Sequence, residues 1–161
     1  MFRELLIALS IVTICVVIHT AGLVLFAQVI IERSGKPERM ATVPRQTLLL
    51  IVVFAVVITL HLIEATLWAT FYYLRSLFPN FETALYFSLV TYASIGFGDV
   101  VLPERWRLLS AIEGISGVLL CGLSAAFIFA VITALFQTRM QHRSSSSQNV
   151  DQPKTVSRTG L

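Results

Sequence analysis

The sequence predicts an all-α integral membrane protein with three transmembrane helices and a shorter helix that enters the membrane between the second and third. Two observations lead to this fold class. Hydrophobic residues make up 56% of the chain and charged residues only 13%, whereas a soluble domain is about 25% charged. Three apolar runs also exceed the ~20 residues that a helix needs to cross a bilayer, namely 5–31, 47–74 and 108–137.

The first apolar run, 5–31, contains no Asp, Glu, Lys or Arg. A cleaved signal peptide is an alternative for its first part, because Arg3 precedes it and the small residues at 20–22 resemble a cleavage site. The apolar core of a signal peptide is about 7–15 residues long, however, and this run is longer. We therefore expect residues 1–46 to form an additional transmembrane helix and a cytoplasmic loop.

A shorter apolar stretch, 81–93, lies between the second and third runs and is too short to cross the membrane. Asn80 is a favourable helix N-cap before it, and Glu82 adds an acidic group to the first turn. The stretch leads into a Gly-x-Gly sequence at 96–98, which does not continue a helix. Because such backbone is tolerated at membrane depth only inside protein or beside an aqueous path, the sequence predicts a re-entrant helix and loop.

Residues 91–99 read Thr-Tyr-Ala-Ser-Ile-Gly-Phe-Gly-Asp. This segment resembles the pore loop of potassium channels, whose usual form is Thr-Val/Ile-Gly-Tyr/Phe-Gly-Asp. The resemblance covers roughly residues 47–136, and the residues at 61–69 and 84–88 add a similarity to small bacterial ion-channel proteins. It implies a pore domain at 47–137 with an outer helix, a pore helix, a selectivity filter and an inner helix.

The resemblance further implies a potassium-selective channel subunit that conducts passively in a four-fold homotetramer. In such a filter, rings of backbone carbonyls replace the water shell of the ion, and glycine permits the backbone angles that this needs. Potassium would be bound at Ser94, Ile95, Gly96 and Phe97, with Gly98 completing the filter. The hydroxyl of Ser94 takes the place of the usual threonine hydroxyl, while the side chains of Ile95 and Phe97 would brace the filter. Potassium is the permeant ion, and no cofactor is expected.

Other parts of the pore follow from the same resemblance. Asp99 would lie at the outer mouth, where acidic groups collect cations. Gly117 and Gly122 occupy the positions of a hinge glycine and a second glycine in bacterial potassium channels, although small residues also let membrane helices pack closely. One apolar face of the third helix should line the cavity, with Val118, Cys121, Ala125 and Phe129.

Ionisable residues lie well inside the apolar runs. Glu64 and Glu113 should be paired, protonated or beside water, because a charge at the bilayer centre costs about 2.5–3.5 kcal/mol. His61 shares a helix face with Glu64, and His19 should hydrogen-bond a neighbouring helix. Two interpretations remain open for the carboxyl groups, which are gating by protonation and hydrogen-bonded support of the filter.

The helical position of Glu113 favours the supporting role. At about 100° per residue, Glu113 lies about 140° from Val118 and about 80° from Cys121 around the helix. If those two residues face the cavity, the carboxyl group points sideways, toward the pore helix or the second transmembrane helix. The hydroxyl groups available on the pore helix belong to Tyr86, Ser88, Thr91 and Tyr92.

The distribution of basic residues predicts the topology. The loop between the first two runs and the tail together hold Arg33, Lys36, Arg39, Arg45, Arg139, Arg143, Lys154 and Arg158. The remaining basic residues are Arg3, Arg75, Arg105 and Arg107. This excess places the first loop and the C-terminus in the cytoplasm and the N-terminus outside. We expect a multi-pass protein of the inner (plasma) membrane, in contact with lipid, with a disordered tail at 138–161.

The sequence also bears on other possible functions. A net charge of +3 without a separate basic face argues against nucleic-acid binding. The sequence shows no nucleophile–base pair and no set of metal ligands of the kind that enzymes use. A non-selective or regulatory channel subunit is one alternative, and a proton-coupled transporter using Glu64, His61 and Glu113 is another. The transporter is disfavoured because no internal repeat is visible. The apolar runs lack the regular arginines of a voltage sensor, so voltage dependence should be weak.

Overall fold

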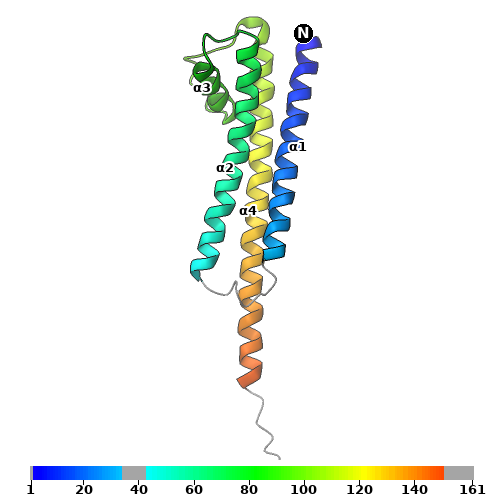
Figure 1. Cartoon of the computed structure of the whole chain (residues 1–161), viewed down its shortest axis with the longest axis vertical. Helices are drawn as coiled ribbons and strands as arrows, with labels where there is room; N and C mark the ends of the chain where they lie inside the picture. The colour runs from blue at the N-terminus through cyan, green and yellow to red at the C-terminus, as the bar shows by residue number, and fades with distance from the viewer. Residues whose placement is uncertain (1, 34–42, 151–161) are drawn as a thin grey trace, which may run out of the picture.

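The computed structural model describes residues 2–33 and 43–150, with the side chains of 33, 138, 139 and 141–150 left out of the description. The described residues form helices α1 (Phe2–Arg33), α2 (Val43–Leu74), α3 (Phe81–Tyr92), the short 3-10 helix η2 (Glu104–Trp106) and α4 (Arg107–Val150). They contain no strand. The three long helices run side by side, with α3 next to one end of the bundle (Figure 1).

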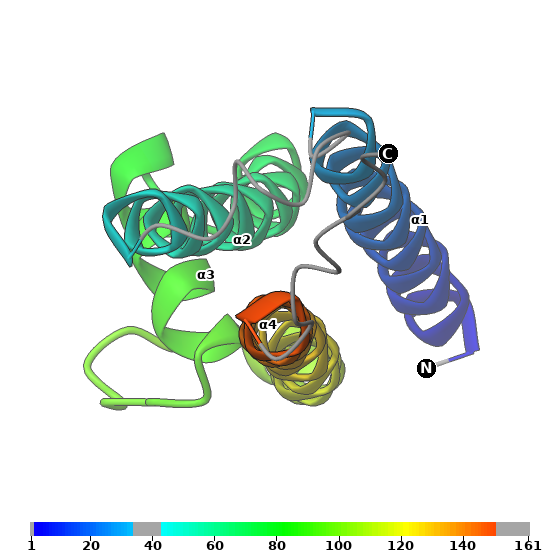
Figure 2. The same ribbon diagram turned by 90° about the horizontal axis from the view of Figure 1, so that it is seen from below.

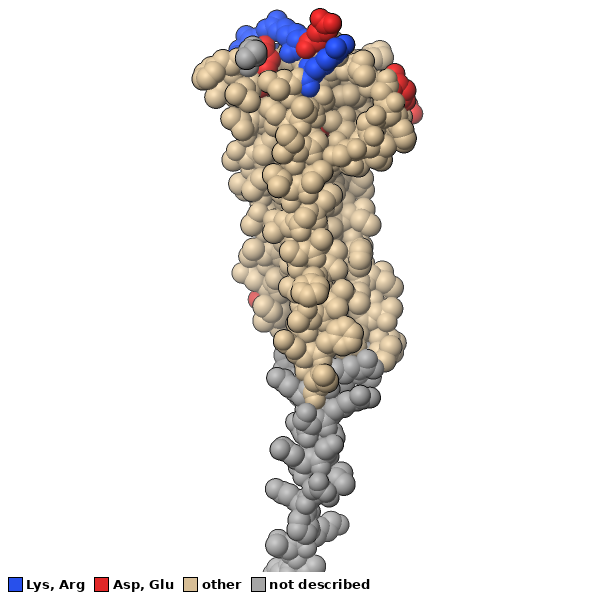
Figure 3. Space-filling view, turned by 180° about the vertical axis from the view of Figure 1, so that it is seen from behind, with Lys and Arg blue, Asp and Glu red and all other residues tan. Residues whose placement is uncertain are grey.

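Among the described residues, three helices are long and apolar enough to cross a membrane. They cover Phe2–Glu32, Val43–Leu74 and Glu104–Gln137. Each contains one of the three apolar runs seen in the sequence. Charged side chains gather at one end of the molecule in the face shown in Figure 3, and a long uncharged surface follows. Such a surface matches a bilayer interior, where charged groups are unfavourable.

α3 is short because its sequence both starts and stops it. The side chain of Asn80 accepts a hydrogen bond from the backbone N–H of Thr83 at 2.8 Å, which confirms the predicted N-cap. The helix ends at Tyr92, and the chain turns at Ser94 with a positive φ. α3 packs against both α2 and α4, whereas α1 packs against α2 and α4 from another side (Figure 2).

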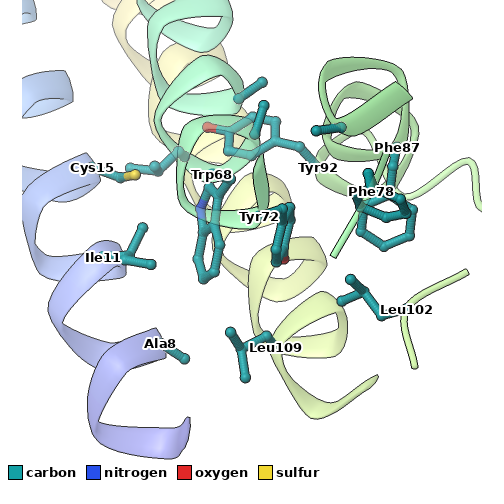
Figure 4. Close-up of a cluster of buried hydrophobic side chains, with 14 residues drawn as sticks. Ala8, Ile11, Cys15, Trp68, Tyr72, Phe78, Phe87, Tyr92, Leu102 and Leu109 are labelled. Carbon is teal, nitrogen blue, oxygen red and sulfur yellow. The ribbon is translucent and has the colours of Figure 1, made fainter. Parts of the chain in front are cut away.

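A cluster of buried apolar side chains joins all four α-helices (Figure 4). Trp68 and Tyr72 of α2 are fully buried in it. The Tyr72 ring meets Phe87 of α3 edge-on, with ring centres 5.5 Å apart. Inside a bilayer, helices associate through such close packing rather than through exclusion of water. The cluster therefore fixes α3 against α2 at the end of the bundle where α3 lies.

α4 extends further than the sequence indicated. Residues 138–150 continue the helix, although a disordered tail was expected from residue 138. The stretch from Gln137 to Val150 contains neither glycine nor proline, so nothing in it terminates a helix. The first proline that would do so is Pro153. Residues 151–161, like Lys36 and Arg39 of the first loop, lie outside the described residues.

Two glycines of α4 have different surroundings. A Cβ atom placed on Gly117 would lie 2.1 Å from the backbone carbonyl oxygen of Tyr92, the last residue of α3. A Cβ atom on Gly122 would meet no atom within 4 Å. Gly117 is therefore required by the close approach of α3 and α4, whereas Gly122 is not needed for packing within one chain.

This difference predicts opposite effects of two alanine substitutions. Gly117→Ala forces α4 away from α3 and should lower the free energy of unfolding by about 1–3 kcal/mol. Gly122→Ala is the matched control, and it should be neutral or stabilising by up to about 1 kcal/mol because alanine favours the helix. Thermal unfolding of both purified variants in detergent measures the difference. Equal shifts of the unfolding midpoint for the two variants would contradict the close contact.

Candidate functional site

The loop that follows α3, residues 93–103, has an unusual backbone. Gly96 and Gly98 have φ values of 58° and 79°, and Ser94 has a φ of 57°. The two glycines adopt this left-handed region without strain. At Ser94 the same conformation costs about 1–2 kcal/mol, so the surrounding structure must hold it. Positive φ thus recurs at every second residue from 94 to 98.

The start of this loop is tied to the last turn of α3. The N–H groups of Ile95 and Gly96 both donate to the carbonyl of Val90, at 2.9 and 3.3 Å. The N–H of Ser94 donates to the carbonyl of Thr91 at 2.8 Å. The position of the loop therefore follows from the position of the C-terminal end of α3.

The side chains of the loop are mostly exposed within one chain. Ile95 is 56% exposed and Phe97 is 66% exposed. The hydroxyl of Ser94 lies 3.5 Å from the carbonyl oxygen of Gly114 on α4. A hollow of about 460 Å³ lies between α3, the 93–103 loop and α4. The loop thus presents large apolar side chains and an unfilled space that a single chain does not cover.

Asp99 directly follows the glycine segment and is held by α3. The hydroxyl of Tyr86 donates a hydrogen bond to the carboxylate of Asp99 at 2.8 Å. This bond raises the pKa of Tyr86 above its ordinary value, because the phenol proton is shared with a carboxylate. The contact joins the middle of α3 to the end of the glycine segment, so both ends of that segment are fastened to α3.

Glu113 of α4 is fully buried and contacts two hydroxyl groups. Tyr72 of α2 donates to one carboxyl oxygen at 2.7 Å. The hydroxyl of Ser88 on α3 lies 2.5 Å from the other carboxyl oxygen and 2.7 Å from the carbonyl oxygen of Ala65. Glu113 therefore links α4 to both α2 and α3. Ser88 is one of the four hydroxyl residues suggested by the sequence, whereas Tyr72 was not foreseen.

The two contacts of Ser88 bear on the protonation of Glu113, because each pairs its hydroxyl with an oxygen atom. A hydroxyl group has one proton to donate, and the carbonyl of Ala65 can only accept. If Ser88 donates to Ala65, its contact with Glu113 is a hydrogen bond only when the carboxyl group supplies the proton. A neutral Glu113 thus satisfies every polar atom of this group, which suits a site inside a membrane-spanning helix.

The second buried carboxyl group, Glu64 of α2, lies in a separate polar cluster. His19 of α1 contacts one of its oxygens at 2.8 Å, and the hydroxyl of Tyr92 donates to the other. His61 lies 3.5 Å from Glu64 and 3.1 Å from the Tyr92 hydroxyl. Both imidazoles also contact Ser124 of α4. His19 thus bonds neighbouring helices, as the sequence indicated.

The hydrogen-bond partners within this cluster were harder to find from the sequence. A lone histidine in an apolar run signals that a polar partner exists, which directed attention to His19 but did not identify the partner. Ser124 lies in a helix rich in small residues, where a serine carries no distinguishing signal.

The same cluster has the residue types of a metal site. Ligand atoms of His19, His61 and Glu64 lie within 4.8 Å of one another. Each of these atoms already has a hydrogen-bond partner, however, and a divalent cation with one carboxylate would leave a net positive charge inside the membrane. The geometry therefore fits a set of hydrogen bonds better than a resident metal ion.

The face of α4 expected to line a cavity is exposed within one chain. Its predicted members Val118, Cys121, Ala125 and Phe129 are all exposed. Glu113 is buried on a different side, against α2 and α3. Their role in a cavity stays a prediction, as do the hinge role of the two glycines and the ion-binding role of the 94–98 backbone.

Comparison with known proteins adds one match. A family model described as "Ion channel" matches residues 46–134, more than half of the chain. The matched region contains nearly all of α2, all of α3, the 93–103 loop and most of α4, but it excludes α1. No curated protein and no solved structure gives a significant match. Together with the three spanning helices, the match identifies a multi-pass membrane protein.

The proton assigned to Glu113 can be tested by substitution. Glu113→Gln should change the free energy of unfolding by less than about 1 kcal/mol, because an amide accepts from Tyr72 and donates to Ser88 as a neutral acid does. Glu113→Ala should destabilise by about 1–3 kcal/mol for each hydroxyl left unpaired.

Thermal unfolding in detergent distinguishes these variants, with Glu104→Ala, an exposed carboxylate of η2, as the control that should have little effect. Equal destabilisation by glutamine and alanine would show that Glu113 is ionised, and no destabilisation by either would show that its contacts are dispensable.

Proposed function

The chain belongs to the ion channel family, and on that premise we propose that it is one subunit of a potassium-selective channel. The observation that carries the proposal is the 94–98 backbone. Its alternating positive φ angles at 94, 96 and 98 turn the chain in the way that a line of inward carbonyl groups requires. Potassium would be held by the carbonyls of Ser94, Ile95, Gly96 and Phe97.

The proposed assembly is a four-fold homotetramer. One chain supplies one such loop, and a ring of carbonyls needs several loops around one axis. The exposed Ile95 and Phe97 and the hollow beside them support a neighbouring copy at this position. The long apolar helices are also largely exposed in one chain, with only 11–28% of each spanning window buried. Neighbouring subunits and lipid would cover those surfaces.

α4 would be the inner helix of the pore in this assembly. Val118, Cys121, Ala125 and Phe129 would face the axis below the filter, and Phe129 would form an apolar constriction that gates by dewetting. Because Gly117 is occupied by contact with α3, Gly122 is the better candidate for a hinge.

The direction of the chain in the membrane is also a proposal. The N-terminus and α3 lie at the same end of the bundle (Figure 1), as expected if both face outward. The excess of basic residues between the first two apolar runs (Arg33, Lys36, Arg39 and Arg45) and in the tail assigns the opposite end to the cytoplasm. The membrane would be the inner (plasma) membrane of the cell.

Recording from the purified protein in planar bilayers tests ion selectivity. We predict single-channel currents in potassium chloride and a reversal potential that follows the potassium gradient when sodium replaces potassium on one side. The matched variants are Gly96→Ala and Gly122→Ala, of which the first should abolish selectivity, because its φ of 58° disfavours alanine, and the second should not. Equal passage of potassium and sodium would favour a non-selective channel, and proton-driven flux without channel currents would favour a transporter.

The two cysteines provide a test of the helix register. Cys121 is exposed on the face assigned to the cavity, whereas Cys15 is buried between helices. A charged thiol reagent applied from the side of the C-terminus should therefore reduce the current of open wild-type channels by blocking the cavity. Cys121→Ser should remove this inhibition, while Cys15→Ser should leave it unchanged. An open channel that is insensitive to the reagent would show that Cys121 does not face the ion path.

A further inference from the structure

α1 lies outside the region shared with the ion channel family, yet it carries a fully buried histidine. His19 is one of only two buried polar residues of α1 in the described part of the chain, the other being Glu4 at its start. A polar side chain inside a membrane bundle is unfavourable unless it is hydrogen-bonded. The partners of His19 therefore indicate what α1 does.

The hydrogen bonds of His19 belong to a closed ring of five side chains. His19 contacts Glu64 through Nδ1 at 2.8 Å and Ser124 through Nε2 at 2.9 Å. Ser124 contacts Nε2 of His61 at 3.0 Å. The ring closes because Nδ1 of His61 lies 3.1 Å from the hydroxyl of Tyr92, which in turn donates to Glu64. Its members come from α1, α2, α3 and α4.

Counting the protons shows that the ring can be fully hydrogen-bonded without a net charge. Five hydrogen bonds need five protons, of which the two hydroxyl groups supply two. The other three are held by two imidazoles and one carboxyl group, whose net charge is zero when they carry three protons between them. A fully bonded ring is therefore neutral as a whole, and it suits the apolar interior. Removal of any member leaves each of its two neighbours one hydrogen bond short.

One member of the ring stands next to the proposed filter. Tyr92 is the last residue of α3, it is 4% exposed, and Ser94 follows two residues later. Its backbone carbonyl is pressed against Gly117 of α4, while its hydroxyl is fixed in the ring. Because the first residues of the loop hydrogen-bond to the last turn of α3, a displacement of Tyr92 displaces the filter.

We propose that α1 is a working part of the pore, and that His19 is a positioning residue for the filter, acting through Glu64 and Tyr92. This inference rests on the proposed function, since it assigns a role in conduction to contacts behind the filter. His19 never touches the ion in this scheme. It keeps the ring complete. The complete ring holds the C-terminal end of α3 in the position in which the 94–98 backbone conducts ions.

The first test compares three substitutions in α1 by bilayer recording of the full chain. His19→Leu should lower the potassium open probability about tenfold or more, since one buried unpaired group corresponds to a factor of that order. His19→Gln should stay within about twofold of wild type, because its amide can accept from one neighbour and donate to the other. Thr20→Leu, at an exposed position of the same helix, should have no effect.

The second test is a double-mutant cycle between two side chains that share no direct contact in the ring. His19→Leu and Tyr92→Phe each break it, so the double variant should show about the same open probability as either single variant. A structural role of α1 unrelated to the filter would instead give effects that add. If His19→Leu fails to assemble, His19→Asn replaces it, because its shorter amide cannot reach both partners.

The outcomes separate this inference from the function on which it rests. Wild-type open probability in His19→Leu or His19→Asn, or additive effects in the cycle, would overturn the role of His19 while potassium conduction by the wild type stands. A failure of His19→Gln to restore conduction would overturn it as well. A wild-type protein that passes no potassium current would contradict the proposed function and this inference together.

Discussion

Two carboxyl groups buried in apolar helices impose the constraint on which the rest of this structure depends. Glu64 and Glu113 are both fully buried, and each would be strongly unfavourable in a membrane without hydrogen-bond partners. Their partners come from different helices: Tyr72 and Ser88 for Glu113, and His19 and Tyr92 for Glu64. Satisfying these two groups thereby sets the position of α3 between α2 and α4.

The geometry of the 93–103 loop follows from that placement. Backbone hydrogen bonds from residues 94–96 fasten its start to the last turn of α3, and the bond from Tyr86 to Asp99 fastens the end of its glycine segment. Close contact with Gly117 leaves no freedom for the end of α3 to move toward α4. The loop can thus hold the left-handed conformation of Ser94, which the residue alone would not favour.

The sequence was sufficient for features that depend on local pattern. Apolar length predicted the three spanning helices, and Asn80 predicted the start of α3. The partners of buried polar groups were less accessible, because they depend on how helices distant in sequence face each other. Helical geometry pointed Glu113 toward α3 or α2, where Ser88 and Tyr72 lie, but nothing distinguished Tyr72 from other tyrosines or Ser124 from other small residues. The helical continuation over 138–150 differs from the expected disordered tail because a polar stretch without glycine or proline has nothing that ends a helix.

The central proposal is that ions pass along the backbone of residues 94–98 on the axis of a tetramer. Anomalous X-ray scattering from crystals of the purified protein grown with rubidium in place of potassium measures this directly. We expect a row of rubidium peaks on a four-fold axis beside the carbonyl groups of Ser94 to Phe97. Crystals without such an axis, or rubidium bound only elsewhere, for instance between His19, His61 and Glu64, would contradict it.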